Sequence, residues 1–284
     1  MWNIMGNDLS RARALTVTSL LVNFGAQLYG MITTPNMKDV ADMNHYAFSP
    51  NPYFIAVFVT GQVVLQLAWI RKLFVDDPPN GYCVIAQNPP SPTAARESTA
   101  MSPVTDQEED RAWKAAVMYA PVYAIGNLCI VGWLFFWLHE KFVGSQVLVT
   151  VNTLLQLAAV VALPPAQPTS PALHKLTHVV AKTFAGIAVL DFLDNGAIAF
   201  RYRPPPSSVV QALTYTFFPL AAACSGPLFA AVLLYDVLAV AVGQTGVEGA
   251  TPWPQRLGWT TLATAIILGV KFATRGSQFF HHSH

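Results

Sequence analysis

Seven long apolar stretches dominate this sequence, and they restrict the folds that it can adopt. A helix needs roughly 20 mostly apolar residues to cross the hydrocarbon core of a bilayer. Hydrophobic residues make up 53% of the 284-residue chain, charged residues only 11%, and the mean hydropathy is +0.41. These values lie outside the range of soluble domains. We therefore predict an all-α protein, a polytopic transmembrane helical bundle of about seven spans: residues 15–33, 53–73, 115–137, 144–163, 176–200, 209–243 and 257–275.

The more polar segments divide the chain into five parts. We expect a cytoplasmic N-terminal segment (1–14), two transmembrane helices (15–74), a disordered polar loop (75–112), a five-helix transmembrane region (113–275) and a C-terminal tail (276–284). The loop is rich in Pro, Ser, Thr and charge, which is typical of disorder. Its Ser-Pro pairs at Ser91 and Ser102 would suit a proline-directed kinase if the loop is cytoplasmic, and a simple tether is the alternative.

Orientation follows from Lys and Arg, which gather in cytoplasmic loops of membrane proteins. Their distribution favours a cytoplasmic N-terminus, and seven crossings would then place the C-terminus on the other side. The stretch 209–243 is too long for one straight crossing at 1.5 Å per residue. Because Pro219 and the sequence SGP (225–227) lie inside it, we expect a kinked or broken helix there.

Charge and cysteine content exclude several classes of protein. The net charge of +1 gives no basic face for nucleic acid. Cys83, Cys129 and Cys224 are too few and too scattered for a disulfide framework or a zinc site. The sequence indicates no metal site and identifies no cofactor, and the bilayer is the partner that it does indicate.

Ionisable residues inside the predicted spans are the strongest functional signal, because such residues pair with each other or mark a pathway. His178 and Lys182 share one face of the fifth span, four residues apart, and Asp191, Asp194 and Asn195 form a second polar patch.

Matching charges at similar depth would pair Lys182 with Asp236, and Asp191 or Asp194 with Lys271. Three interpretations remain open for these groups. They are static ion pairs between helices, a proton or substrate path, or a catalytic centre in which Asp191, Asp194 and Asp236 serve as acid, base or metal ligands.

Amides recur within the other spans and favour hydrogen bonds between helices. An amide-lined polar cavity is the alternative for this set, which comprises Asn23, Gln27, Gln62, Gln66, Asn127, Asn152 and Gln156. Trp137 lies near a span end, where aromatic residues favour the membrane interface. Trp133 lies deeper and would either pack against lipid or stack on a flat apolar ligand.

Two segments carry a resemblance to a known group. The first is YAPVYAIGNLCIVGWLFFWLHEKFVGSQVLVTVNTLLQL (119–157), and the second is NHYAFSPNPYFIAVFVTGQVVLQLAWIRKLF (44–74). Both resemble the tryptophan-rich sensory protein (TspO/translocator protein) group, which implies a five-helix bundle that binds porphyrins and sterol-like ligands. That resemblance implies Asn127, Trp133 and Trp137 as ligand-binding residues. The chain from about residue 44 is more specifically similar to a family of uncharacterised fungal multi-pass membrane proteins.

We therefore expect an integral membrane protein that binds or transports a small hydrophobic ligand. The alternative is a membrane-embedded cyclase or transferase that acts on an isoprenoid-like substrate with its intramembrane carboxylates.

Overall fold

The protein is all-α, as predicted, in the part that the computed structural model describes. That part comprises residues 2–76 and 103–280, with side chains described within 8–76 and 107–274. All its regular elements are helices: α1 (Trp2–Ile32), α2 (Met37–Met43), α3 (Pro52–Val75), α5 (Pro103–Leu138), α6 (Phe142–Ala162), α7 (Ala172–Ala199), α8 (Ser208–Cys224), α9 (Pro227–Gly243) and α10 (Trp253–Phe280).

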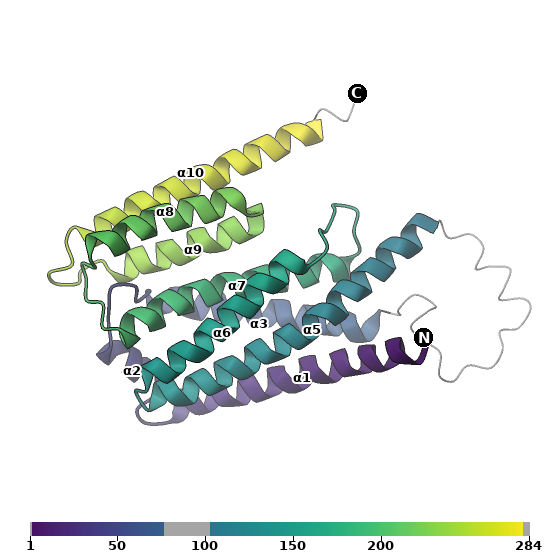
Figure 1. Ribbon diagram of the computed structural model, residues 1–284, viewed down its shortest axis with the longest axis horizontal. Coiled ribbons are helices and arrows are strands. Elements are labelled where there is room, and N and C mark those ends of the chain that lie inside the picture. The colour runs from purple at the N-terminus through teal and green to yellow at the C-terminus, as the bar shows by residue number, and fades with distance from the viewer. Residues whose placement is uncertain (1, 77–102, 281–284) are drawn as a thin grey trace, which may run out of the picture.

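The helices form two groups that run along a common axis (Figure 1). Helices α1, α3, α5, α6 and α7 pack together as one bundle, and α8, α9 and α10 pack together beside it. The main contact between the groups is that of α7 with α9. Helix α7 is therefore the central element, and the middle of its sequence, from Val180 to Leu190, is almost entirely buried.

Six of the described helices are long and apolar enough to cross a membrane: α1, α3, α5, α6, α7 and α10. Large apolar side chains cover their outer surfaces, among them Ile32 (81% exposed), Val161 (86%) and Trp259 (70%). An apolar surface of this extent suits lipid and would not suit water. The multi-pass transmembrane bundle predicted from the sequence is thus confirmed, and six long spans stand close to the expected seven.

The predicted stretch 209–243 is broken, as expected, and the break makes a helical hairpin. Helix α8 ends at Cys224, Ser225 and Gly226 form the turn, and Pro227 begins α9, a position that proline favours. The two helices run in opposite directions and pack side by side (Figure 1). Where we expected one kinked or broken crossing, the structure has two complete helices of 17 residues each, or ~25 Å at 1.5 Å per residue.

The hairpin adds one pass and so changes the position of the chain ends. The outer ends of α1 and α10 lie at the same end of the bundle, which we call the first face (Figure 1). The opposite end, which contains residues 44–51 and the start of α10, is the second face. The expected placement of the two chain ends on opposite sides was therefore wrong.

Two expected boundaries also move, because helices extend into polar sequence. Residues 103–112 belong to α5 and not to the polar loop, and residues 276–280 belong to α10 and not to the tail. Acidic residues early in α5 interact favourably with the helix dipole. Asp110 also forms an ion pair of 2.6 Å with Lys114, one turn later. The expected disorder over 77–102, including Ser91 and Ser102, and Cys83 lie outside the described residues.

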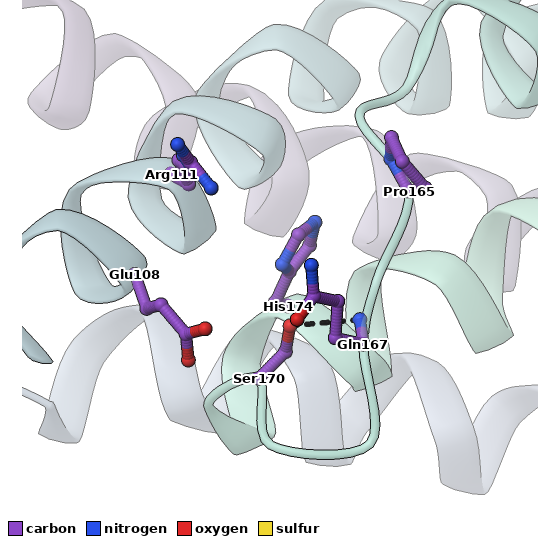
Figure 2. A pocket seen from close by; sticks show the side chains of 6 residues that line it. All are labelled: Glu108, Arg111, Pro165, Gln167, Ser170 and His174. Carbon is purple, nitrogen blue, oxygen red and sulfur yellow. Dashed lines mark hydrogen bonds between the residues drawn. The ribbon is translucent and has the colours of Figure 1, made fainter. Parts of the chain in front are cut away.

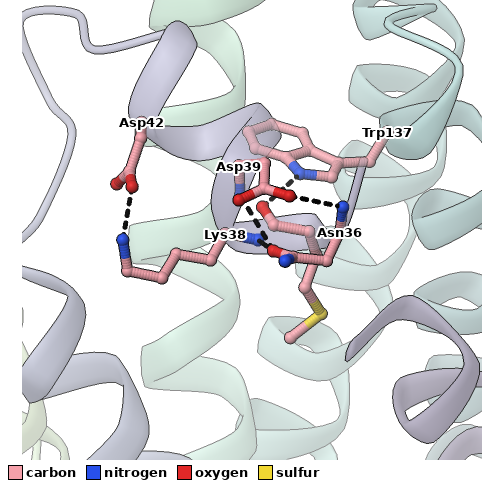
Figure 3. Close-up of polar contacts among 6 residues, drawn as sticks. Asn36, Lys38, Asp39, Asp42 and Trp137 are labelled. Atoms are coloured by element: carbon pink, nitrogen blue, oxygen red, sulfur yellow. Dashed lines mark hydrogen bonds and ion pairs between the residues drawn. The ribbon is translucent and has the colours of Figure 1, made fainter. Parts of the chain in front are cut away.

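Short helix α2 lies on the second face and is fixed by polar contacts (Figure 3). Asn36 accepts hydrogen bonds from the backbone of Lys38 and Asp39, and the Asp39 carboxylate accepts one from the Asn36 backbone, which completes a capping box. Lys38 pairs with Asp42, and this hydrogen-bonded carboxylate raises the pKa of the lysine. Trp137 at the end of α5 donates to the carbonyl of Met37 at 3.2 Å, so α2 is tied to the bundle.

Gly243 at the end of α9 provides a test of the close packing of residues 44–51 on the second face. A Cβ atom at this position would lie 2.6 Å from the carbonyl carbon of Pro50 and 2.7 Å from the backbone nitrogen of Asn51. We expect Gly243→Ala to lower the free energy of unfolding by about 1–3 kcal/mol, because the backbone of the 44–51 segment must move. The control is Gly258→Ala in α10, where a Cβ would meet nothing within 4 Å. Thermal unfolding of both variants in detergent checks the prediction, and equal melting temperatures would contradict it.

Candidate functional site

Two neighbouring aspartates of α7 and a third from α9, distant in sequence, lie on helices that pack against each other. Asp191 and Asp194 lie on α7, and Asp236 lies on α9, the helix that packs against it. Asp191 is within electrostatic range of both Asp194 and Asp236. We call these three residues the carboxylate centre.

The two helices approach each other closely beside this centre. A Cβ atom on Gly186 of α7 would collide with the side chain of Val232, one turn before Asp236 on α9. Only glycine fits there without a shift of the neighbouring helix. The sequence therefore brings the α9 carboxylate against α7 by means of a small residue on α7, a device common in membrane bundles.

The three carboxyl groups differ in their contacts. One Asp194 oxygen accepts a hydrogen bond of 2.9 Å from the Ser49 hydroxyl. Asp236 is fully buried, and neither of its oxygens has a hydrogen-bond partner within the protein. An ionised carboxylate in such a place needs a neutralising partner, since its desolvation is very costly.

Residues 44–51 cover the centre on the second face. The Ser49 hydroxyl that binds Asp194 also accepts a hydrogen bond from the backbone of Tyr46 at 3.0 Å. Gln244, just after α9, donates to the carbonyls of Tyr46 at 2.8 Å and Ser49 at 3.1 Å. The segment is further held by the Trp253 indole, which donates to the carbonyl of Ala47 at 2.7 Å. The centre thus lies directly beneath a well-packed surface segment.

Both expected ion pairs across the spans were wrong. Lys271 donates to the carbonyls of Ala223 and Ser225 at 2.7 and 2.5 Å, and so caps the end of α8. Lys182 lies near the turn of the hairpin, since its Nζ is 3.8 Å from the position of a Cβ on Gly226. Asp236 lies well along α9 from that turn and accepts no hydrogen bond. The hairpin reverses the direction of α9 and α10 relative to a single crossing, which inverts the depths that the pairing assumed.

His178 lies at the first face with His174, on one face of α7. The imidazole of His178 lies 2.6 Å from the carbonyl oxygen of Pro164, and that of His174 lies 3.2 Å from the same oxygen. His174 also lines a small hollow with Glu108 and Arg111 of α5 and residues 165–170 of the preceding loop (Figure 2). Its volume of about 20 Å³ suffices for one water molecule. These histidines therefore bind the loop to α7, remote from the carboxylate centre.

Four of the seven amides form hydrogen bonds between helices, the arrangement that the sequence favours. Asn23 of α1 donates to Asn127 of α5 at 2.7 Å. Tyr123 and Tyr119 of α5 donate to Gln66 of α3 and Gln156 of α6, both at 3.0 Å. Gln62 is an exception, because it is buried and both of its side-chain polar atoms have no partner.

Asn195 is the main junction of this kind. Its oxygen accepts from Trp133 at 3.1 Å and Ser145 at 2.6 Å, and its nitrogen donates to Gln146 at 2.8 Å. One side chain on α7 therefore joins α5 and α6.

The translocator-protein resemblance implies three ligand-binding residues, and all three form hydrogen bonds within the protein. Asn127 is fully buried between Asn23 and the carbonyl of Tyr123. The rings of Trp133 and Trp137 lie 5.3 Å apart, and both indole nitrogens donate within the protein. Neither the hollow at His174 nor the groove between α8 and α10 described below includes any of the three.

Metal binding gains no support from the geometry. Within the described ranges, no group of three or more His, Cys, Asp or Glu side chains is arranged to hold a metal ion. Cys129 and Cys224 carry free thiols.

Ser49 and Gln244 were not foreseen from the sequence. The turn sequence SPNP around Ser49 was the one local signal that this segment has a fixed shape.

Comparison with known proteins finds no family model, no curated protein and no solved structure that matches the chain. Fold and site together define an all-α membrane protein with three aspartates at the contact of α7 and α9, of which Asp236 is fully buried.

Asn195→Leu tests the junction. The change leaves Trp133, Ser145 and Gln146 without their partner on α7, and each orphaned buried group costs about 1–3 kcal/mol. We expect a loss of at least about 2 kcal/mol in thermal or denaturant unfolding of the purified protein. Asn44→Leu is the control, because its amide donates to one carbonyl of the preceding helix. Equal stability of the two variants would show that the junction contributes little.

Proposed function

We propose that the chain is a proton-coupled membrane transport protein in which the carboxylate centre binds the proton. The observation that carries this proposal is Asp236, a fully buried carboxyl group without a hydrogen-bond partner, on a helix packed against the one that carries Asp191. Carboxyl groups inside membrane bundles are costly and typically belong to ion pathways or proton relays.

The contacts favour a proton over a static ion pair. A structural ion pair would join each carboxylate to a lysine or arginine through hydrogen bonds, and Asp236 has none. Lys271, the cation expected for Asp191 or Asp194, caps α8 instead. A proton neutralises a carboxylate without any further protein group, so it fits this environment.

The position of the centre supports access from the second face. Asp194 is hydrogen bonded to Ser49, and Ser49 belongs to the segment that covers that face. A small movement of residues 44–51 would expose Asp194 to water. The transported solute would be the small hydrophobic or amphipathic ligand expected from the sequence. Its porphyrin-like or sterol-like character stays a prediction from the resemblance.

A membrane-embedded enzyme is the second candidate, and one observation favours it. The three residues considered as catalytic candidates, Asp191, Asp194 and Asp236, are brought together from two helices. One protonated and one ionised carboxyl group at such a site would serve as general acid and base. An enzyme would need turnover of an isoprenoid-like substrate, whereas a transporter would move protons across a sealed membrane.

Proton flux into proteoliposomes separates these functions. We expect the reconstituted protein to carry protons, measured with a trapped pH dye under an imposed membrane potential. Asp236→Asn should reduce this flux at least tenfold, because an amide cannot bind and release the proton. The control is Asp42→Asn, which removes an exposed acid of α2 outside the bundle.

Labelling with an apolar carbodiimide provides a readout without substrate. Such reagents modify protonated carboxyl groups in apolar surroundings, so Asp236 or Asp191 should be labelled in wild type, and labelling should decrease as pH rises. Flux equal to that of protein-free liposomes would contradict transport, and labelling that persists in that case would leave the enzyme as the better candidate.

We also propose that the first face is cytoplasmic. Of the described basic residues, Arg11, Arg13, Arg71, Lys72, Arg111, Lys114, Lys175 and Lys271 lie toward the first face, and Lys38, Lys141, Arg201, Arg203 and Arg256 lie toward the second. This excess supports a cytoplasmic first face.

Reporter fusions test the orientation. We expect a reporter that is active only in the cytoplasm to be active when fused to either chain end, since α1 and α10 both have their outer ends at the first face. A fusion within residues 245–252, the loop before α10, should be inactive. Activity at one chain end alone would contradict the even number of passes.

A further inference from the structure

A groove on the flank of the second helix group has the features of a lipid site. It lies between α8 and α10 and has a volume of about 480 Å³, within the range of small-molecule sites. Helix α8 contributes Tyr215 and Pro219, and α10 contributes Arg256, Trp259, Thr260 and Ala263. Both helices belong to the second helix group (Figure 1), and neither carries a residue of the carboxylate centre.

One end of the groove is cationic and lies at the second face. Arg256 is in the first turn of α10, and one of its terminal nitrogens donates to the Gln211 amide oxygen in the first turn of α8. A guanidinium has five N–H donors, so this contact leaves others directed elsewhere. The residue is exposed, at the depth where phospholipid headgroups meet a spanning helix.

A polar atom without a partner lies one turn deeper. The Tyr215 hydroxyl is buried and has no hydrogen-bond partner. It follows Gln211 by four residues on α8, or ~6 Å along the helix, so it is on the same side of α8 as the Arg256 contact. Pro219 and Ala263 continue the groove with apolar surface, and Trp259 forms an exposed aromatic wall.

The order of groups along the groove is therefore a cation, then a hydroxyl, then apolar surface. A glycerophospholipid presents the matching order, which is a phosphate, then ester carbonyls, then acyl chains. The surrounding bilayer supplies this molecule at the correct depth and orientation. We propose that the groove binds an anionic glycerophospholipid, with the phosphate on Arg256, an ester carbonyl on the Tyr215 hydroxyl and an acyl chain along Pro219 and Ala263.

Native mass spectrometry of the full chain in detergent tests this proposal. The protein is incubated with equimolar phosphatidylglycerol and phosphatidylcholine of the same acyl chains, and the bound lipids are counted. We expect phosphatidylglycerol to be retained preferentially by wild type. Arg256→Gln should weaken its retention about tenfold, because a charge-assisted hydrogen bond is lost. Arg203→Gln is the matched control, an exposed arginine on the same face outside the groove.

Two further variants keep the test decisive if Arg256→Gln folds poorly. Tyr215→Phe removes an oxygen that has no partner in the protein, so folding should be retained, and lipid retention should fall about threefold. Ala263→Phe fills the apolar part without a change of charge and should remove the preference for phosphatidylglycerol. Equal losses for Arg256→Gln and Arg203→Gln would overturn the proposal in favour of general surface charge. Absence of any preference in wild type, or unchanged retention in Tyr215→Phe and Ala263→Phe, would overturn it as well.

Discussion

Inside a bilayer no water is available for hydrogen bonding, so each polar group must find its partner within the protein. This constraint explains the hydrogen bonds between helices. Tyr119 and Tyr123 bind amides of α6 and α3, and Asn195 joins α5 and α6 to α7. Asp236 and Gln62 depart from this pattern, because no polar atom of either buried side chain has such a partner. Burial of a carboxylate costs far more than burial of a neutral amide, so the unpaired Asp236 is better explained by function than by packing.

The carboxylate centre depends on features that are not themselves acidic. Gly186 allows α9 to approach α7, and Gly243 allows the segment 44–51 to pass closely over the end of α9. Ser49 then lies where it can bind Asp194. The centre is therefore part of the interface between the two helix groups, and any movement of one group against the other would change the distance between Asp191 and Asp236.

Local properties of the sequence predicted the long helices well, because length and hydropathy alone decide whether a stretch can span a membrane. The spacing of the amides along their helices also predicted hydrogen bonds between helices. The hairpin of α8 and α9 did not, because a kinked single crossing and a tight hairpin have the same local composition. A single crossing gives α9 and α10 the opposite chain direction from the one observed. The expected pairings of Lys182 with Asp236 and of Lys271 with Asp191 or Asp194 were wrong for this reason. Ser49 and Gln244 act through contacts distant in sequence, which no local pattern reveals.

The cap that Lys271 places on the end of α8 also has a consequence for biosynthesis. The two carbonyls that it binds precede it by 48 and 46 residues, so they are made long before their partner. While α10 is being synthesised, the turn of the hairpin has unpaired carbonyls that only water or headgroups can satisfy. Because the turn lies at the first face, those contacts with water or headgroups are replaced by Lys271 only after α10 has been made.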